Sequence, residues 1–501
     1  MHFKKTASRA FGFATGLFIL ILAGPSQVVA QCELDKLTAM DGAAGDAFGA
    51  SVAIARDYAV VGASFHDDNG PSSGAAYVFE RQGIVWVQVA ELLASDGAQS
   101  DLFGSAASIS RDRILLGANG HDAGGPFSST GAAYVFHRVG SAWIEEDKLL
   151  ADDLDFVQHM GISVSISGDR AVAGAPFNDE ICCNSGAVYV FRREGTNWVQ
   201  EQKLTASDAA SGDQFGRRVA ISGDIIVVGS HLDDDLGDGS GSAYVFRRQG
   251  TTWVEVDKLT ASDGGFADRF GISVAIDGKQ LVVGAEFAAF GRGAAYVFRA
   301  EANGAIWLEE DILIASDGAP ADQFGESVSI SRGHVLVGAL LHDDPGESSG
   351  SAYLFRSTGA GWSEVAKLTP NDLAAGDVFG ASVSISPSYA AVGATFDDDA
   401  GNNSGSAYVF GVSGDCNGNG SPDACDILDG VACDCNDNGV PDECEGCIGD
   451  LDGDGTVGVK DLLILLGSWG PCDCCPADLN CDGVVDGADQ AILEANWGPC
   501  P

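Results

Sequence analysis

One motif recurs seven times between Phe48 and Phe410, and this regularity constrains the fold more than any other feature of the chain. A copy opens with an aromatic residue or methionine followed by glycine, runs through an apolar stretch ending in Val-Gly-Ala or a close variant, and continues into Ala-Tyr-Val-Phe. In most copies a tryptophan-led segment ending in Lys-Leu follows. The copies begin at Phe48, Phe103, Met160, Phe215, Phe270, Phe324 and Phe379, so they are 54 to 57 residues apart. So regular a step indicates identical units that stack in a row or close into a ring.

Each unit contains four short apolar or β-branched stretches separated by glycine, serine and aspartate. In the first unit they occupy residues 51–54, 58–62, 76–79 and 86–92. This pattern predicts four strands per unit and an all-β fold. Seven units of four antiparallel strands are typical of a seven-bladed β-propeller, whose closed ring leaves only short, protected sheet edges. An open solenoid is the alternative.

The two ends of the array favour the ring. The last unit stops after Phe410 and lacks its tryptophan-led strand, whereas residues 33–38 match the second half of that strand. In a ring these ends meet, and the N-terminal strand completes the seventh blade. In a solenoid both ends would remain exposed edges that need caps. We therefore expect residues 31–412 to form a propeller closed by its N-terminal strand.

Charge and targeting signals place the chain outside the cytoplasm. The formal net charge of −45 excludes nucleic acid as a partner. Residues 1–30 contain Lys4, Lys5 and Arg9, an apolar stretch at 11–23 and a small-residue ending, as in a signal peptide. No later segment reaches the roughly 20 apolar residues of a transmembrane helix. We expect a secreted or cell-surface protein, and the 11 cysteines after residue 414 indicate disulfides there.

Strand direction assigns the loops of each blade to two faces. The loop after Val-Gly-Ala and the loop between units share one face, which collects aspartates, while most arginines belong to the other. Aspartate pairs between units, such as Asp96 and Asp101, are expected to cap turns. Four loops carry a histidine just before the aspartates, a residue type that can bind a transition metal or act as a base: His66, His121, His231 and His342. Loops that vary over a fixed frame indicate a recognition surface.

After Gly414 the composition changes to aspartate, asparagine, glycine and cysteine, with 19 acidic residues against one lysine. Four segments match a loop that offers oxygen ligands to Ca²⁺ at positions 1, 3, 5, 9 and 12, with glycine at position 6. The first two offer Asp415, Asn417, Asn419, Asp423 and Asp426, then Asp434, Asn436, Asn438, Asp442 and Glu445. The last two offer Asp450, Asp452, Asp454, Thr456 and Asp461, then Asp478, Asn480, Asp482, Val484, Asp486 and Asp489, where Thr456 and Val484 stand at the backbone-carbonyl position 7. Crowded carboxylates repel one another unless a cation binds, so we predict that Ca²⁺ orders this region.

The segments that follow the four loops differ. Loops three and four lead into apolar helical runs at residues 462–469 and 491–497, which can pack on one another. Loops one and two carry proline at position 8 and cysteine at position 11, namely Pro422 with Cys425 and Pro441 with Cys444, a pattern expected to discourage a following helix.

Three resemblances extend this interpretation. The repeats over residues 33–412 resemble FG-GAP repeats, the blades of integrin α-subunit propellers and of many secreted bacterial proteins. Integrin-type blades often insert an Asp-rich calcium loop before the second strand, but this chain has tight turns there, so the resemblance does not imply calcium in the blades. Residues 413–447 resemble thrombospondin type 3 repeats, a calcium-binding stalk. Residues 448–501 resemble a type I dockerin with two EF-hand-type loops, which implies a cohesin-like partner, although positions 10 and 11 hold Val459-Lys460 and Gly487-Ala488 instead of serine or threonine.

These observations predict a secreted calcium-binding recognition, adhesion or assembly protein. The propeller would bind an extracellular protein or glycan, and the tail would attach the molecule to a cohesin-like or cell-surface partner. An exported polysaccharide-degrading enzyme, a glycoside hydrolase or lyase carrying a dockerin, is the alternative, because dockerins are frequently attached to such enzymes. No catalytic residue is assigned, since nucleophile-elbow, zinc-protease and P-loop motifs are absent from the sequence. A purely structural spacer is a third hypothesis.

Overall fold

The fold was analysed in a computed structural model of the chain. It describes residues 32–123, 129–153, 157–301, 304–359, 361–412, 421–432, 434, 441, 449–451, 456–471, 477–479 and 484–499. The predicted signal peptide lies outside these residues.

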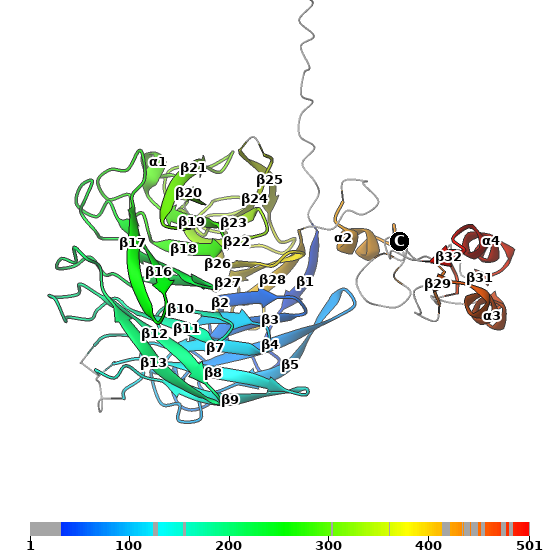
Figure 1. The fold of residues 1–501 in the computed structure, drawn as a ribbon, viewed down its shortest axis with the longest axis horizontal. Coiled ribbons are helices and arrows are strands. Elements are labelled where there is room, and N and C mark those ends of the chain that lie inside the picture. Colours follow the sequence, from blue (N-terminus) through cyan, green and yellow to red (C-terminus); the bar gives the residue numbers. More distant parts are fainter. Residues whose placement is uncertain are drawn as a thin grey trace, which may run out of the picture.

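Seven sheets, each of four antiparallel strands, form the body of the molecule (Figure 1). The first blade consists of β2 (Phe48–Ala55), β3 (Tyr58–Ala63), β4 (Ala75–Gln82) and β5 (Val85–Leu92). The second and third blades are β6 (Phe103–Ser110), β7 (Arg113–Ala118), β8 (Ala132–Val139) and β9 (Ala142–Leu149), then β10 (Val164–Ser167), β11 (Arg170–Ala175), β12 (Ala187–Glu194) and β13 (Asn197–Leu204). The fourth and fifth are β14 (Arg218–Ser222), β15 (Ile225–Ser230), β16 (Ser242–Gln249) and β17 (Thr252–Leu259), then β18 (Ser273–Asp277), β19 (Gln280–Ala285), the short helix α1 (Ala288–Gly291), β20 (Ala294–Glu301) and β21 (Ile306–Leu313). The sixth is β22 (Phe324–Ser331), β23 (His334–Ala339), β24 (Ser351–Ser357) and β25 (Trp362–Leu368).

The seventh blade joins the two ends of the array. Its strands are β26 (Phe379–Ile385), β27 (Tyr389–Ala394) and β28 (Ser406–Gly411), and its outer strand is β1 (Glu33–Leu37) from the start of the described chain. β1 pairs antiparallel with β28, with Lys36 opposite Tyr408. Figure 1 shows β1 in dark blue beside the late strands of the ring. The predicted seven-bladed ring, closed by its N-terminal strand, is confirmed, and the open solenoid is wrong.

The aromatic residue that opens each repeat fills the space between neighbouring blades. Phe103 has no exposed surface and belongs to one apolar cluster with Val78 of the first blade and Tyr134 of the second. Its ring centroid lies 5.4 Å from that of Tyr134, in an edge-to-face arrangement. Burying a side chain of this size contributes about 1.5–3 kcal/mol, and such a wedge recurs at each blade junction. The repeated aromatic therefore holds the blades together.

The glycine of Val-Gly-Ala is required by close approach of adjacent blades. A Cβ atom added at Gly62 in β3 would lie 1.9 Å from the carbonyl oxygen of Gly104 in the next blade. No side chain fits this gap without a shift of the backbone. The repeated glycine thus sets the distance between blades, as its recurrence in the sequence suggested.

Short elements follow the propeller. Helix α2 (Asp423–Leu428) is tied to the start of the described chain by a disulfide between Cys425 and Cys32. The expectation that Pro422 discourages a helix here is wrong. Pro422 is the residue just before the first turn of α2, where the helix needs no hydrogen bond from a backbone N–H, so proline is tolerated. Its carbonyl oxygen accepts hydrogen bonds from the backbone N–H groups of Cys425 and Asp426.

Two further helices, α3 (Val459–Gly467) and α4 (Gly487–Ala495), occupy the helical runs of the last two loops. Two short pairings accompany them: β29 (Thr456–Val457) with β32 (Gly498–Pro499), and β30 (Gly470–Pro471) with β31 (Val484–Val485). Leu465 and Leu493 are fully buried in one small apolar cluster with Val457 and Val485. None of the helices among the described residues is long and apolar enough to cross a membrane. The assignment of residues 448–501 to a dockerin-like domain stays a prediction.

Candidate functional site

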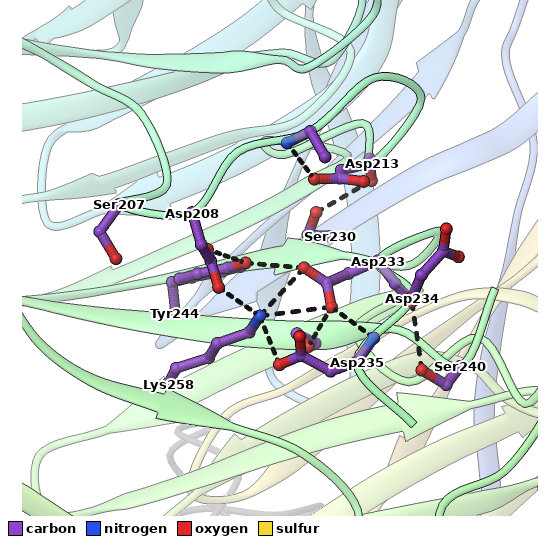
Figure 2. Close-up of polar contacts among 12 residues, drawn as sticks. Ser207, Asp208, Asp213, Ser230, Asp233, Asp234, Asp235, Ser240, Tyr244 and Lys258 are labelled. Atoms are coloured by element: carbon purple, nitrogen blue, oxygen red, sulfur yellow. Dashed lines mark hydrogen bonds and ion pairs between the residues drawn. The ribbon is translucent and has the colours of Figure 1, made fainter. Parts of the chain in front are cut away.

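The face that carries the loops after each second strand, called here the loop face, holds one polar cluster in each blade except the fifth. Each cluster gathers the first aspartate of the inter-blade loop, two residues of the loop after Val-Gly-Ala, a tyrosine of the third strand and a residue of the fourth strand. The antiparallel register places the last two opposite each other, as with Tyr244 and Lys258 in the fourth blade. Segments from four parts of the repeat therefore meet at one point (Figure 2).

In the fourth blade a lysine ammonium lies at the centre of three carboxylates. Lys258 Nζ is 2.7 Å from Asp208, 3.1 Å from Asp233 and 2.6 Å from Asp235. The Tyr244 hydroxyl oxygen lies 2.8 Å from a carboxylate oxygen of Asp208 and 2.8 Å from one of Asp233, so its single proton can be donated to either. Figure 2 shows these side chains converging on the lysine nitrogen. The side chain of Asp233 is only 6% exposed, so its charge depends on these partners.

Four other blades repeat this arrangement. The lysines are Lys148, Lys203, Lys367 and Lys36 in the second, third, sixth and seventh blades. In the second and sixth blades a histidine replaces the buried aspartate. Lys148 Nζ lies 2.6 Å from His121 Nε2, and the His121 Nδ1 atom lies 3.0 Å from Asp101. His121 therefore faces an internal cation.

The ionisation of the fourth-blade cluster reflects this pairing. Burial alone would lower the pKa of Lys258, but the Asp208, Asp235 and Asp233 carboxylates outweigh burial and raise it. Burial would likewise raise the pKa of Asp208, yet the Lys258 ammonium and the Tyr244 hydroxyl hold it below its usual range. The Lys258 ammonium thus favours the ionised form of Asp208 and joins the loop to the fourth strand.

The inter-blade aspartates have two different roles. The second of each pair accepts a backbone N–H three residues earlier, as Asp213 does from Ala210 at 2.6 Å and Asp101 from Ala98 at 2.9 Å. The predicted turn-capping role is confirmed for these residues. In the pairs whose blade carries the lysine, the first aspartate, such as Asp208, contacts the lysine and the tyrosine instead, a role that sequence reasoning missed. The recurrence of lysine about 50 residues after this aspartate was the available signal.

His231 differs from the other three candidate histidines. It stands two positions earlier in its loop and is buried, with no hydrogen-bond partner for Nδ1. Burial, and then the charges of Arg217, Arg269 and Arg218, lower the pKa of His231 to about 3. His231 is therefore a neutral side chain beside three arginines, and it belongs to a second site on the loop face.

That site lies at the mouth of the channel enclosed by the inner strands. The upper part of the channel is a cavity of about 190 Å³ lined mainly by serine, alanine and valine, with Arg218 as its charged residue. Burial and the like charge of Arg218 lower the pKa of Arg217 to about 10, and Arg217 Nε has no hydrogen-bond partner. Burial and the neighbouring Glu286 carboxylate raise the pKa of Glu326. We call Arg217, Arg218, Arg269, His231, Glu286 and Glu326 the mouth cluster.

The predicted calcium ligands are only partly within the described residues. Asp415, Asn417, Asn419, Asn436, Asn438, Asp442, Glu445, Asp452, Asp454, Asn480 and Asp482 lie outside them. In loop three, the buried Asp461 accepts from the backbone N–H of Leu451 at 2.8 Å and of Gly458 at 2.7 Å, which brings position 12 back to the start of the loop. In loop four, Asp489 is buried and accepts from the Asp486 amide at 2.8 Å.

The remaining described candidates are distributed over the same elements. Asp423 and Asp426 lie in the first turn of α2, and Asp450 and Asp478 stand at the first positions of loops three and four. Thr456 and Val484 begin β29 and β31, and Asp434 is described without an assigned element. The calcium assignment stays a prediction for all of them.

A comparison with known protein families matches the FG-GAP repeat over residues 32–79, 86–136, 143–191, 198–246, 253–298, 307–355 and 362–410. The chain belongs to the FG-GAP repeat family. Each matched stretch begins in the outer strand of one blade and ends in the third strand of the next, so the FG-GAP unit spans two blades. A search of curated proteins found no match.

Proposed function

We propose that this FG-GAP propeller protein is an extracellular, calcium-binding recognition or assembly protein. The loop face would bind a protein or glycan, and the C-terminal segment would attach the molecule to a partner. FG-GAP repeats are typical of extracellular proteins, and residues 1–30 have the features of a signal peptide. The loops on this face vary over a constant frame, which suits recognition.

The observation that carries the proposal is the asymmetry of the channel mouth. The third residue of each opening motif is uncharged in five blades, but it is Arg217 in the fourth and Glu326 in the sixth. A ring of equivalent blades offers every ligand the same surface at each step. The mouth cluster breaks this equivalence, because charged groups of three adjacent blades meet beside the cavity.

The chemistry of the mouth cluster favours an anionic group on the ligand. Arg269 is paired with Glu286 at 2.8 Å, whereas Arg217 and Arg218 have no carboxylate within ion-pair distance among the described residues. A guanidinium group binds carboxylate or sulfate through two parallel hydrogen bonds. The surrounding acidic loops repel other anions, so only a ligand whose shape delivers its acid to the mouth would bind.

The C-terminal part of the proposal concerns calcium and attachment. The buried position-12 carboxylates Asp461 and Asp489 stand where EF-hand loops place a ligand, and oxygen donors occupy the other template positions except position 9 of loop three, which is Gly458. We expect residues 413–447 to act as a thrombospondin-like stalk and residues 448–501 as a dockerin-like attachment module. Calcium removal should then lower the helical circular dichroism and the protease resistance of the tail. Retention of both in excess chelator would contradict this part, with Asp461→Asn/Asp489→Asn as the matched variant.

Recognition is tested by probing the full chain on arrays of extracellular proteins and of uronate-bearing or sulfated glycans. The variant Arg217→Ala/Arg218→Ala should reduce binding of every hit, because it removes the cationic side of the mouth. The matched control is Arg299→Ala, since Arg299 lies at the end of β20 on the opposite face with a 57% exposed side chain. Hits that bind both variants equally would place recognition elsewhere, and an absence of hits would favour the spacer hypothesis.

The enzyme alternative gains no support from the carboxylate pair of the mouth cluster. Glu326 lies within hydrogen-bonding reach of Glu286. Glycosidases hold their two carboxyl groups about 5–5.5 Å apart when retaining and about 6.5–9.5 Å apart when inverting. Release of soluble sugar from a polysaccharide, abolished by Glu326→Gln, would overturn our preference for a binding function.

A further inference from the structure

The first blade lacks the internal cation of its neighbours. One tyrosine of the third strand recurs in every blade, and in the first blade it is Tyr77. The fourth-strand residue opposite Tyr77 is Glu91, whereas the fourth blade carries Lys258 at this position. Replacing an ammonium by a carboxylate changes the local charge by two units in the negative direction. The other members of the cluster are retained, so the first blade has the acids without the lysine.

Four potential ligands of the first blade converge. One donor atom each from Asp41, His66, Asp68 and Glu91 lie within 4.8 Å of one another. They come from the inter-blade loop, the loop after β3 and strand β5, so three segments meet at one point. Among the described residues, no lysine or arginine forms an ion pair with any of these three carboxylates.

Two buried polar groups point into this cluster without partners. His66 is only 5% exposed, and its Nε2 atom has no hydrogen-bond partner although it lies 3.2 Å from Asp68 and 3.9 Å from Glu91. The hydroxyl of Tyr77, which has no exposed surface, is also unpartnered. The other ring nitrogen of His66 is 3.1 Å from Asp46, which places the ring proton on Nδ1 and leaves the Nε2 lone pair facing two carboxylates. Such an arrangement is repulsive unless a proton or a metal cation lies between Nε2 and the carboxylates.

The sixth blade shows where that cation belongs. There Lys367 Nζ lies 2.9 Å from His342 Nε2, 2.8 Å from Asp317 and 2.9 Å from Asp344. His342 Nδ1 lies 2.8 Å from Asp322, as His66 Nδ1 lies beside Asp46. The lysine nitrogen thus occupies the point that the four ligands of the first blade surround.

The fifth blade also lacks the lysine and shows what accompanies that loss when no ligand set remains. Ile312 stands opposite Tyr296, and the loop of this blade carries no acid or histidine at the positions that hold the ligands in the first blade. The positions of His66 and Asp68 are there Ala288 and Phe290, in helix α1. A blade without the lysine therefore either loses its acids or requires another cation, and the first blade has kept its acids.

We propose that the first blade binds a divalent transition-metal ion through His66 Nε2 and the carboxylates of Asp41, Asp68 and Glu91, with Asp46 orienting the histidine. One imidazole nitrogen and three carboxylate oxygens suit Zn²⁺ or a similar first-row ion better than Ca²⁺, which prefers oxygen ligands alone. A carboxylate behind a metal-bound histidine is a frequent supporting contact. The exposed side chain of Asp68 can rotate inward to complete the coordination.

The test uses the full chain with millimolar Ca²⁺ to occupy the tail and Co²⁺ as the spectroscopic probe. Wild-type protein should bind one Co²⁺ whose visible d–d bands appear without a thiolate charge-transfer band, which separates this site from cysteine-bound metal. Glu91→Lys should remove that equivalent while keeping the circular dichroism, since it installs the lysine of the sixth blade. Asp46→Asn should weaken binding about 10- to 100-fold.

The reciprocal variant is Lys367→Glu, which gives the sixth blade the ligand set of the first. It should gain one Co²⁺ equivalent with the same spectrum. Equal stoichiometry and affinity in wild-type and Glu91→Lys protein would overturn the proposal. Should Glu91→Lys lose its native circular dichroism, His66→Asn decides instead, because metal binding unchanged in that variant would also refute the site.

Discussion

Removing the central lysine of one cluster should destabilise the propeller measurably. In Lys258→Met the carboxylates of Asp208, Asp233 and Asp235 remain, with oxygens within 4.8 Å of one another. At an effective dielectric constant of about 20, two charges at this separation repel by about 3 kcal/mol. The lysine side chain is 19% exposed and Asp233 is 6% exposed, whereas Asp208 and Asp235 are close to half exposed.

These exposures set the expected magnitude. Losing the partner of a buried charge costs about 3–5 kcal/mol, while an exposed ion pair contributes about 0–1 kcal/mol. Because only one of the three carboxylates is buried, we expect Lys258→Met to lower the free energy of unfolding by about 2–4 kcal/mol at pH 7. Urea unfolding followed by circular dichroism measures it. The control is Lys279→Met, which removes an exposed lysine of the fifth blade and should change stability by less than about 0.5 kcal/mol.

The pH dependence of this difference is a second readout. The pKa of Asp208 is depressed in the folded protein, so its pairing stabilises the fold above the unfolded pKa and is lost as pH falls through the folded pKa. The gap between Lys258→Met and wild type should therefore narrow below about pH 4. A variant that unfolds like Lys279→Met at pH 7, or a gap that does not depend on pH, would refute the ion-pair reasoning.

Three further predictions concern the seam, the blade spacing and the mouth cluster. Replacing Cys32 and Cys425 by serine should lower the free energy of unfolding by about 2–5 kcal/mol, since their disulfide joins residues 393 positions apart in the chain. Equal urea midpoints for the variant and the wild type would contradict a stabilising role of the disulfide. Gly62→Ala should lower the free energy of unfolding by at least about 1–3 kcal/mol, because its Cβ would lie 1.9 Å from the carbonyl oxygen of Gly104. The control is Gly265→Ala, whose Cβ would meet only one oxygen, at 3.6 Å. Equal thermal midpoints for the two variants would be inconsistent with the spacing role of Gly62. The pKa of His231 is about 3 in the folded protein against an ordinary value of 6.5, so its contribution to stability is lost as pH falls from 6.5 toward 3, by about 3 kcal/mol between pH 7 and pH 4. In His231→Asn, the free energy of unfolding measured by urea titration should therefore fall by about 3 kcal/mol less over this pH range. An unchanged pH profile would show that His231 takes no part in it.

The ring could be predicted from the sequence because the same residue pattern recurs in every blade. Every blade carries the same glycine and tyrosine positions, and six of the seven open with phenylalanine, so the sequence indicates the strand boundaries seven times. The missing strand after Phe410 and its counterpart before Leu37 then settled closure. Periodic features are determined by local pattern, and local pattern is visible in a single sequence.

The polar clusters were harder to foresee, because their members are far apart in the chain. Asp208 and Lys258 are separated by 50 residues, and only the register of β16 against β17 brings Lys258 to Tyr244. The mouth cluster joins residues of three blades, so no local motif marks it. Helix α2 was mispredicted for a different reason, since Pro422 was treated as a helix breaker when its position made it a helix start.

Closure of the ring by β1 means that the strand nearest the N-terminus waits for the last one to be synthesised. Until β28 is available, β1 has no partner, and the seventh blade exposes an unpaired edge for the whole time that the other six are assembling. The Cys32–Cys425 bond then locks the last pairing to form. Anything that captures β1 early, whether a chaperone, a protease or a second copy of the chain offering its own β28, would decide between a closed monomer and an exchanged dimer.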